Sequence, residues 1–188
     1  MAKVLFICSK GTECGEYSAA FDCLFRAGAK LTTAKVKENE QDNEKYIETY
    51  QGMKILCDNF LEEVKDNIYD MVVFPGGIPN CQILGKNKLV VEVAKKHKKE
   101  GKWYTAICAS PYEIFKQNNI SEDEKITWHP LYKESDGKLF VNERVVVSGK
   151  CITSQGPCTA YEFGFALVEA LFGKEKREKL CKEMLFKA

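Results

Sequence analysis

The sequence predicts an α/β fold in which a mostly parallel sheet lies between two layers of helices. Three apolar runs have the length of strands and little alternation, which is typical of strands buried on both faces: residues 3–9, 69–74 and 103–107. Helical patterns separate them, as in βαβ units with right-handed crossovers. The 188 residues show no repeat and no linker, so one domain is expected over residues 1–188.

The first half of the chain reads as strand, helix and strand, followed by smaller elements. The helix at 13–28 has Tyr17, Ala20, Leu24 and Ala27 on one stripe, and Gly28 suits a left-handed C-terminal cap. The elements predicted after it are a strand at 30–36, a polar loop at 37–45, a hairpin or edge strand within 48–57, and a helical turn at 59–64 capped by Asn59.

The second half alternates strands with longer helices. The strand at 69–74 runs directly into Pro75, Gly76 and Gly77, and an amphipathic helix at 87–102 leads to the central strand. The later predicted elements are a helix from Tyr112, a strand at 125–128, partly antiparallel strands within 139–147 and 151–154, a helix at 159–171 ended by Gly173, and an amphipathic helix at 174–188 with Leu180, Met184 and Leu185 on its apolar side.

Composition argues against several classes of partner. The net charge is +1, and the basic runs at 95–102 and 174–179 carry no interleaved aromatic residues, so we expect solvated helix ends and no nucleic-acid site. The first apolar run is too short for a secretory signal, and no run approaches the length of a membrane span. The sequence therefore predicts a cytoplasmic protein without a membrane partner.

The cysteine and histidine pattern predicts neither a metal site nor a cofactor. None of the nine cysteines forms a C-x-x-C pair, so free thiols in a reducing compartment are expected. Of the two histidines, His97 lies in a lysine-rich helix end and is predicted to be exposed. His129 precedes Pro130, which favours a strand end or loop and leaves it as the histidine available for chemistry.

Cys108 is the leading candidate for a reactive group. It follows a strand and precedes a small-residue turn into a helix, an arrangement that exposes a nucleophile and places a thiol near a helix N-terminus. Glu16, in a first helical turn beyond the first strand, faces the same sheet edge, and Gly76 and Gly77 allow backbone amides to approach a ligand. The alternatives are a buried structural thiol, an acid that complements the helix dipole, and a plain tight turn.

The motifs KGTECGE, FPGG, ICASP, WHPL and TSQGPCTAYEF, in this order over nearly the whole chain, resemble the ThiJ/PfpI superfamily in its DJ-one branch. The resemblance implies a flavodoxin-like sandwich with an extra C-terminal helix, a homodimer, and chemistry without a cofactor. The roles that it implies are a nucleophile at Cys108, its carboxyl partner at Glu16, a nearby histidine at His129, and backbone donors at Gly76, Gly77 and Ala109.

Three departures narrow the expected chemistry. Ala109 stands where peptidase-like relatives have a histidine after the cysteine, which argues against proteolysis. The segment after His129 lacks the His-x-Glu motif of glutamine amidotransferases. Gln155 stands where close relatives often have an arginine, and Cys158 follows, so the sequence does not predict recognition of an anionic group at this loop.

The leading functional hypothesis is a glyoxalase or deglycase that acts on methylglyoxal-type dicarbonyls or their adducts and protects against carbonyl and oxidative stress. In this mechanism a Cys108 thiolate lies beside a neutral Glu16. The main alternative is a redox-sensing or chaperone-like protein that works through oxidation of Cys108. A cysteine peptidase is the least favoured alternative.

Overall fold

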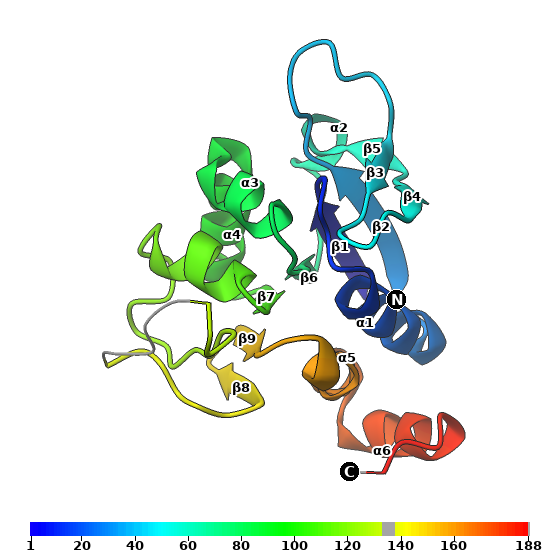
Figure 1. The fold of residues 1–188 in the computed structure, drawn as a ribbon. Helices are drawn as coiled ribbons and strands as arrows, with labels where there is room; N and C mark the ends of the chain where they lie inside the picture. Colours follow the sequence, from blue (N-terminus) through cyan, green and yellow to red (C-terminus); the bar gives the residue numbers. More distant parts are fainter. Residues whose placement is uncertain (133–137, 188) are drawn as a thin grey trace.

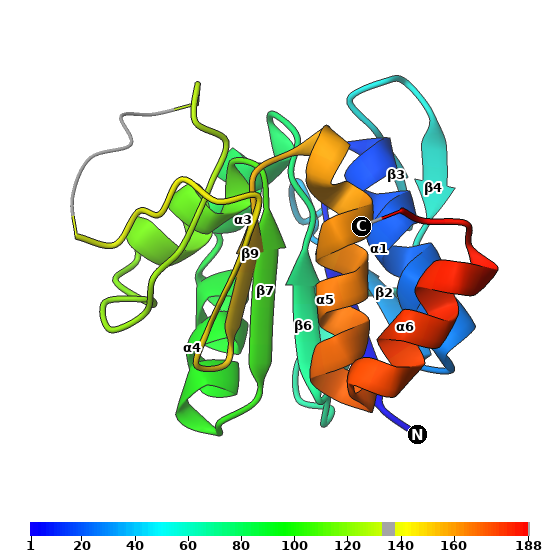
Figure 2. The ribbon, with the colours of Figure 1, turned by 90° about the horizontal axis from the view of Figure 1, so that it is seen from below.

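The computed structural model describes residues 1–132 and 138–187. A seven-stranded sheet with the order β5-β2-β1-β6-β7-β9-β8 forms its centre (Figures 1 and 2). Its strands are β1 (Lys3–Cys8), β2 (Lys30–Lys35), β5 (Asn59–Phe60), β6 (Met71–Phe74), β7 (Trp103–Ile107), β8 (Val145–Ser148) and β9 (Cys151–Ser154). All neighbours are parallel except β8 and β9, which are antiparallel. A separate hairpin consists of β3 (Tyr46–Glu48) and β4 (Lys54–Leu56).

Helices cover both faces of the sheet, which gives the predicted three layers (Figure 2). One face carries α1 (Cys14–Ala27), α5 (Ala160–Phe172) and α6 (Lys174–Glu183), and the other carries α3 (Asn80–Lys86), α4 (Lys88–Lys99) and the π-helix η1 (Pro111–Lys116). The short helix α2 (Leu61–Val64) follows β5. The flavodoxin-like α/β fold class is therefore confirmed.

The central strand β1 shows why the apolar runs predicted this fold. Val4 and Phe6 pack into the hydrophobic cluster under α1 and α5, whereas Leu5 and Ile7 pack into the cluster under α4. All four side chains are fully buried, because successive residues of a strand point to opposite faces and each face is covered. A polar side chain at one of these positions would be buried away from water, whichever face of the sheet it pointed to.

The first predicted helix is confirmed closely. Its stripe of Tyr17, Ala20, Leu24 and Ala27 is buried against the sheet. Gly28 caps it in the left-handed region at φ 95° and donates its backbone N–H to the Phe25 carbonyl.

Several predicted elements were wrong in detail. Residues 125–128 form one isolated bridge, between Ile126 and Phe140, in place of a strand. The helix α3 was not predicted from the sequence. Of the strand predicted within 139–147, only the last residues belong to a strand, which is β8 (Val145–Ser148). Asn59 belongs to β5, so α2 is capped instead by the Glu63 side chain, which accepts the Phe60 N–H at 2.8 Å.

The C-terminal helix is present but shorter than predicted. It ends at Glu183, and Ala188, the last residue of the predicted helix, lies outside the described residues. Leu180 is buried and Met184 packs on the core as expected, but Leu185 is 88% exposed. Phe186 packs on Phe165 instead, with ring centroids 4.7 Å apart. Among the described residues, no helix has both the length and the apolar character needed to cross a membrane.

The prediction that His97 is exposed is wrong. It is 5% exposed, and its Nδ1 bonds to the Val93 carbonyl at 2.8 Å, one turn earlier in α4. Burial lowers the pKa of its imidazole below the ordinary value, so His97 is a neutral core residue at pH 7. The lysine-rich run that suggested exposure continues on the other faces of the same helix.

Candidate active site

Cys108 lies at a sharp turn where β7 ends. Its φ of 66° is in the left-handed region, which residues other than glycine rarely adopt. Two backbone hydrogen bonds hold Cys108 in this conformation. Its N–H donates to the Ser154 carbonyl at 3.0 Å, and its carbonyl accepts the His129 N–H at 2.9 Å. The predicted strand, turn and helix are present, although the helix, η1, is a π-helix. The half-buried thiol thus stands at the carboxyl edge of the sheet.

Glu16 lies beside this thiol and is fully buried. Its Oε2 accepts the Gly76 N–H at 2.9 Å, while Oε1 is buried without a conventional hydrogen-bond partner among the described residues. A Cβ atom on Gly76 would lie 2.4 Å from both the Cys108 Cβ and Glu16 Oε2. Only glycine therefore fits between the two groups, and the carboxyl and the thiol are close enough to influence each other's ionisation.

Gly76 has a different role from the one expected. Its amide is engaged by Glu16, so it holds the acid in place and is not free to stabilise an oxyanion. The amides of Gly77 and Ala109 face the Cys108 sulfur and favour its ionised form. The backbone donors near the sulfur are thus those of Gly77 and Ala109.

Burial dominates the ionisation of the Cys108–Glu16 pair. It raises the pKa of Glu16 to about 8, and the charge of Glu13 acts in the same direction. Burial also raises the pKa of the Cys108 thiol, and an ionised Glu16 would raise it further. At pH 7 the carboxyl is mostly protonated, so that repulsion is largely absent and the carboxyl O–H can donate a hydrogen bond to sulfur. The neutral acid agrees with the sequence-based expectation, whereas burial opposes the expected thiolate.

His129 is tied to the site through its backbone. Its ring Nδ1 accepts the Leu131 N–H at 3.2 Å, and the ring packs against Gly156, where an added Cβ would lie 3.2 Å from Cδ2. Within residues 1–132 and 138–187, no hydrogen bond joins the ring to Cys108 or Glu16. His129 is thus joined to Cys108 through its backbone, and its ring lies beside Gly156.

Sequence reasoning missed Asn80, which holds the loop at residues 75–77, called the glycine loop below. This fully buried residue accepts both the N–H and the hydroxyl of Ser9 at 2.8 Å, and it donates to the carbonyls of Pro75 and Gly76 at 2.9 and 3.1 Å. It thereby connects the ends of β1 and β6. No local pattern indicated it, because its partners lie up to 71 residues away.

The loop that carries Gln155 and Cys158 lies beside Arg144, which is already paired. The Gln155 amide donates to Asn142 Oδ1 at 2.8 Å, and Cys158 is exposed. The nearby Arg144 donates to the Cys158 carbonyl and pairs with Glu162. The Gln155 side chain is thus bonded to Asn142, and the neighbouring arginine is paired with Glu162.

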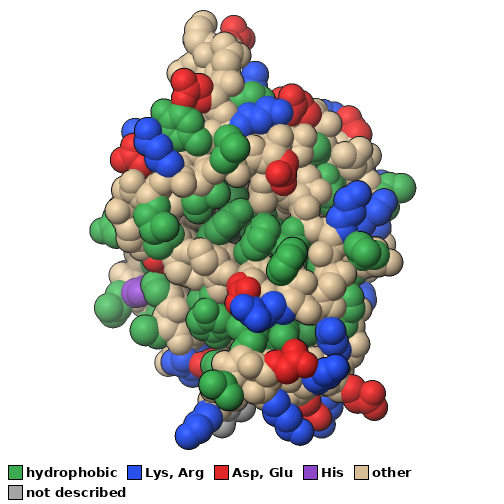
Figure 3. All heavy atoms as spheres, turned by 90° about the vertical axis from the view of Figure 1, so that its right-hand side faces the viewer, with side chains coloured by type: hydrophobic (Ala, Val, Ile, Leu, Met, Phe, Trp, Pro, Cys, Tyr) green, Lys and Arg blue, Asp and Glu red, His purple; other side chains and the backbone are tan. Residues whose placement is uncertain are grey.

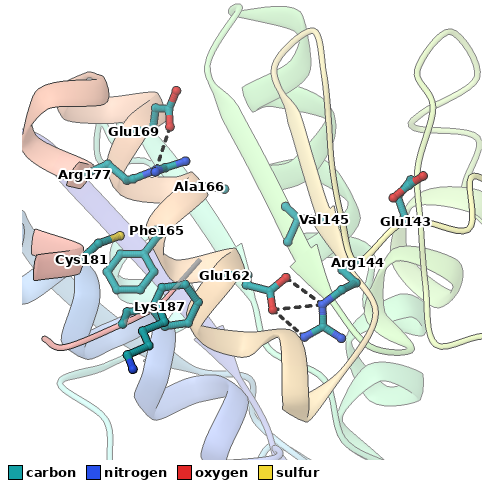
Figure 4. A pocket seen from close by; sticks show the side chains of 11 residues that line it. Glu143, Arg144, Val145, Glu162, Phe165, Ala166, Glu169, Arg177, Cys181 and Lys187 are labelled. Atoms are coloured by element: carbon teal, nitrogen blue, oxygen red, sulfur yellow. Dashed lines mark hydrogen bonds and ion pairs between the residues drawn. The ribbon is translucent and has the colours of Figure 1, made fainter.

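A separate cavity lies away from the Cys108–Glu16 pair. It measures about 570 Å³ and lies between α5, α6 and β8 (Figure 4). Its acids and bases are largely paired, as in Arg144–Glu162 and Arg177–Glu169, and none of the predicted site residues lines it. Within the described residues, no group of three or more His, Cys, Asp or Glu side chains could hold a metal ion.

Comparisons with known proteins agree with the fold and the motifs. The model of the DJ-1/PfpI family matches residues 2–170. The chain is 35% identical over 176 residues to protein DJ-1 homolog B of Arabidopsis thaliana, covering 93% of this chain but 39% of that protein. The chain thus spans less than half the length of this relative.

Two further proteins match over most of their own length. Glutathione-independent glyoxalase DJR-1.2 of Caenorhabditis elegans is 33% identical over 141 residues, which are 73% of this chain and 74% of that protein. The solved structure of oxidized Toxoplasma gondii DJ-1 superposes with a TM-score of 0.93 at 28% identity and covers all of both chains. The chain therefore belongs to the DJ-1/PfpI family.

Proposed function

We propose that this protein is a cofactor-independent glyoxalase or deglycase that acts on methylglyoxal-type dicarbonyls or their adducts. The observation that carries the proposal is the buried Glu16, with a pKa raised to about 8, beside Cys108 at the sheet edge. A carboxyl that keeps its proton near neutral pH can both donate and accept one, as an acid–base catalyst must. The C. elegans relative named as a glyoxalase supports the same class of reaction.

In the first step, the Cys108 sulfur attacks the aldehyde carbon of the dicarbonyl. The new S–C bond turns the carbonyl oxygen into an alkoxide, which the amides of Gly77 and Ala109 stabilise and which takes up a proton to give a hemithioacetal. The proton that the thiol loses passes through Glu16 to the alkoxide, so the addition is balanced and no net charge accumulates in the buried site.

In the second step, Glu16 moves a proton between neighbouring carbons. In its ionised form, which a pKa of about 8 keeps accessible near neutral pH, Glu16 removes the C–H proton from the former aldehyde carbon and gives an enediolate. The acid then returns this proton to the adjacent carbon while the hydroxyl proton of the hemithioacetal passes to the former ketone oxygen, which leaves a thioester on Cys108. Water then cleaves the S–C bond and releases a hydroxy acid and the thiol. For methylglyoxal, addition of one water gives lactate with no net oxidation.

Purified protein incubated with methylglyoxal should therefore produce lactate, and Cys108→Ala should lose this activity. Cys181→Ala is the matched control, because this buried thiol lies on α6 away from the site. Lactate should be measured chromatographically over time, with loss of methylglyoxal followed in parallel. Full activity in the Cys108→Ala protein would overturn the mechanism.

A redox role is the second candidate, and the same geometry supports it. Cys108 is partly accessible, and a protonated Glu16 can hydrogen-bond the oxygens of an oxidised sulfur. The similar T. gondii structure is described as oxidized. Selective addition of two oxygens at Cys108 under mild peroxide, with negligible dicarbonyl turnover, would favour redox sensing or a chaperone-like role over catalysis.

Protective action against carbonyl stress and a cytoplasmic location remain part of the proposal. Peptidase activity remains the least favoured function. Ala109 follows the cysteine, and the ring of His129 bonds to the Leu131 N–H instead of to the thiol. A peptide-substrate panel with Cys108→Ala as the blank tests it.

We also propose a homodimer that uses the face formed by α1 and the β3–β4 hairpin. This face is turned toward the viewer in Figure 3, where hydrophobic side chains gather near its centre. Large exposed side chains on these elements are Phe25 (66%), Tyr50 (69%), Met53 (58%) and Leu56 (77%). An apolar surface of this kind is typical of a protein interface.

Leu56→Lys should convert the dimer to a monomer, because it places a charge in the proposed interface. Val147→Lys, at an exposed position on the distant edge strand β8, is the control and should leave the association state unchanged. Sedimentation equilibrium at micromolar concentration measures both. A monomeric parent protein would contradict the proposal.

A further inference from the structure

The start of α1 is held by the β3–β4 hairpin, which contributes none of the predicted site residues. The Gly11 N–H donates to the Glu48 carbonyl at 2.8 Å, and the Tyr50 N–H donates to the Thr12 carbonyl at 2.9 Å. The Cys14 N–H donates to the Gln51 side-chain oxygen at 3.1 Å. The segment that leads into the helix of Glu16 is therefore fixed against a turn about 40 residues further along the chain.

Glu13 is the central residue of this contact. One carboxylate oxygen, Oε2, accepts the Glu16 N–H at 2.6 Å and so caps α1, while the other, Oε1, accepts a short hydrogen bond from the Gln51 side-chain amide. Its own N–H donates to the Gly76 carbonyl at 3.0 Å. Both oxygens of a half-buried carboxylate are thus fixed within one helical turn of Glu16.

We propose that Glu13, held in place by Gln51, is a positioning residue that controls when the Cys108–Glu16 pair loses its first proton. The proposal rests on the acid–base pair put forward above, but not on the identity of the substrate. The hydrogen bond from Gln51 fixes the orientation of the Glu13 carboxylate, and the carboxylate carries the negative charge that acts on the pair.

The physical basis is the repulsion between like charges in a partly desolvated site. Either ionised form of the pair, a thiolate or a Glu16 carboxylate, places a negative charge near that of Glu13, so Glu13 favours the fully protonated pair. The titratable groups that act on the pair are Glu13 at the start of α1 and the two members themselves. His129 is joined to Cys108 through its backbone N–H. After burial, the charge of Glu13 is the largest influence that raises the pKa of Glu16.

A competing explanation is that Glu13 only caps the helix. An N-cap carboxylate stabilises a helix by accepting an orphan N–H, and its removal would loosen α1 without a specific effect on ionisation. Because this structural role acts on stability and the proposed role acts on a pH midpoint, the two can be separated.

The test is the pH dependence of Cys108 alkylation by iodoacetamide in the full-length protein. Because the chain has nine cysteines, modification should be followed on the Cys108 peptide by mass spectrometry. In Glu13→Gln the apparent pKa of the first ionisation should fall, on the order of one pH unit. Gln51→Ala keeps the charge of Glu13 but removes the hydrogen bond that holds its carboxylate, so the apparent pKa should fall by less. Glu62→Gln, an exposed acid on α2, is the control and should leave the profile unchanged.

Two further variants separate charge from capping. Asp and Asn are both good N-cap residues and have similar size, but only Asp is charged. If charge is responsible, Glu13→Asn should lower the midpoint well below that of Glu13→Asp. Equal midpoints in these two proteins, or a parent-like midpoint in Glu13→Gln, would overturn the proposal and leave Glu13 as a helix cap.

A double variant links the effect to Glu16. In the Glu16→Gln background one member of the pair no longer titrates, so adding Glu13→Gln should shift the Cys108 midpoint by less than it does in the parent. An equal shift in both backgrounds would show that Glu13 acts on the thiol alone and would contradict control of the pair. Alkylation needs no dicarbonyl, so these results stand even if no lactate is formed.

Discussion

Glu16→Gln should lose most dicarbonyl turnover and yet make the protein more stable at neutral pH. The amide can still accept the Gly76 N–H and donate to the Cys108 sulfur, but it cannot move a proton between carbons. Loss of a general acid–base group costs on the order of 100-fold or more in rate. The gain in stability has a separate cause, which is the removal of a buried carboxyl that resists ionisation.

The direction of the pH effect follows from the raised pKa. The folded state holds the Glu16 proton up to about pH 8, whereas the unfolded chain releases it near the ordinary value of 4.5. The parent protein therefore loses stability as the pH rises between these two values, at about 1.4 kcal/mol per pH unit. Between pH 4 and pH 7 the free energy of unfolding of the parent protein should fall by about 3 kcal/mol from this cause. Glu16→Gln has no carboxyl at this position and should not show this fall.

Denaturant unfolding of the parent and Glu16→Gln at pH 4, 7 and 8 measures this effect. The free energies of unfolding should differ little at pH 4 and diverge in favour of the variant as the pH rises. Glu62→Gln should follow the parent throughout. A difference between Glu16→Gln and the parent that stays the same from pH 4 to pH 8 would show that the pKa of Glu16 is not raised.

Gly77→Ala should both destabilise the fold and inactivate the site. Gly77 has a φ of 96°, and an added Cβ would lie 2.2 Å from the Gly11 carbonyl oxygen and 2.5 Å from the Glu13 nitrogen. Both contacts are with backbone, which cannot move away without separating the glycine loop from the start of α1. The combined strain should cost roughly 3 kcal/mol or more, and the Gly77 amide would leave the Cys108 sulfur.

Gly28→Ala is a closely matched control. Gly28 has nearly the same φ, 95°, but nothing lies within 4 Å of an added Cβ. The free energy of unfolding of Gly28→Ala should therefore fall only by the strain of alanine in the left-handed region, roughly 1 kcal/mol, and its turnover should be unchanged. Urea unfolding and lactate formation, measured on both variants, test this. Equal losses of stability in the two proteins would contradict the account of how the glycine loop packs.

The fold was predictable where each strand is covered on both faces. In β1, β6 and β7 the buried positions are apolar apart from Thr105, whose hydroxyl donates to the Val72 carbonyl, so the sequence carries the signal almost residue by residue. The bridge at Ile126 and the helix α3 were not predicted correctly, because their conformations depend on contacts with distant segments. Burial of His97 was missed for a similar reason, since the helix face that packs on the sheet had to be known first.

The site was predictable in its residue types but not in its connections. A strand followed by a sharp turn identified Cys108, and the family motif identified Glu16. The engagement of the Gly76 amide by Glu16 joins residues 60 positions apart, and the Gln51–Glu13 bond joins residues 38 apart. Such bonds leave no local pattern, because their partners lie far apart in the sequence.

The central claim is that Glu16 holds its proton at neutral pH beside Cys108. The most direct measurement is a carbon-13 NMR titration of the Glu side-chain carboxyls, in which the Glu16 resonance is identified by its absence from Glu16→Gln. The account predicts a midpoint of about 8 that moves when Cys108 is alkylated. A Glu16 midpoint near the ordinary 4.5, unchanged by alkylation, would contradict it.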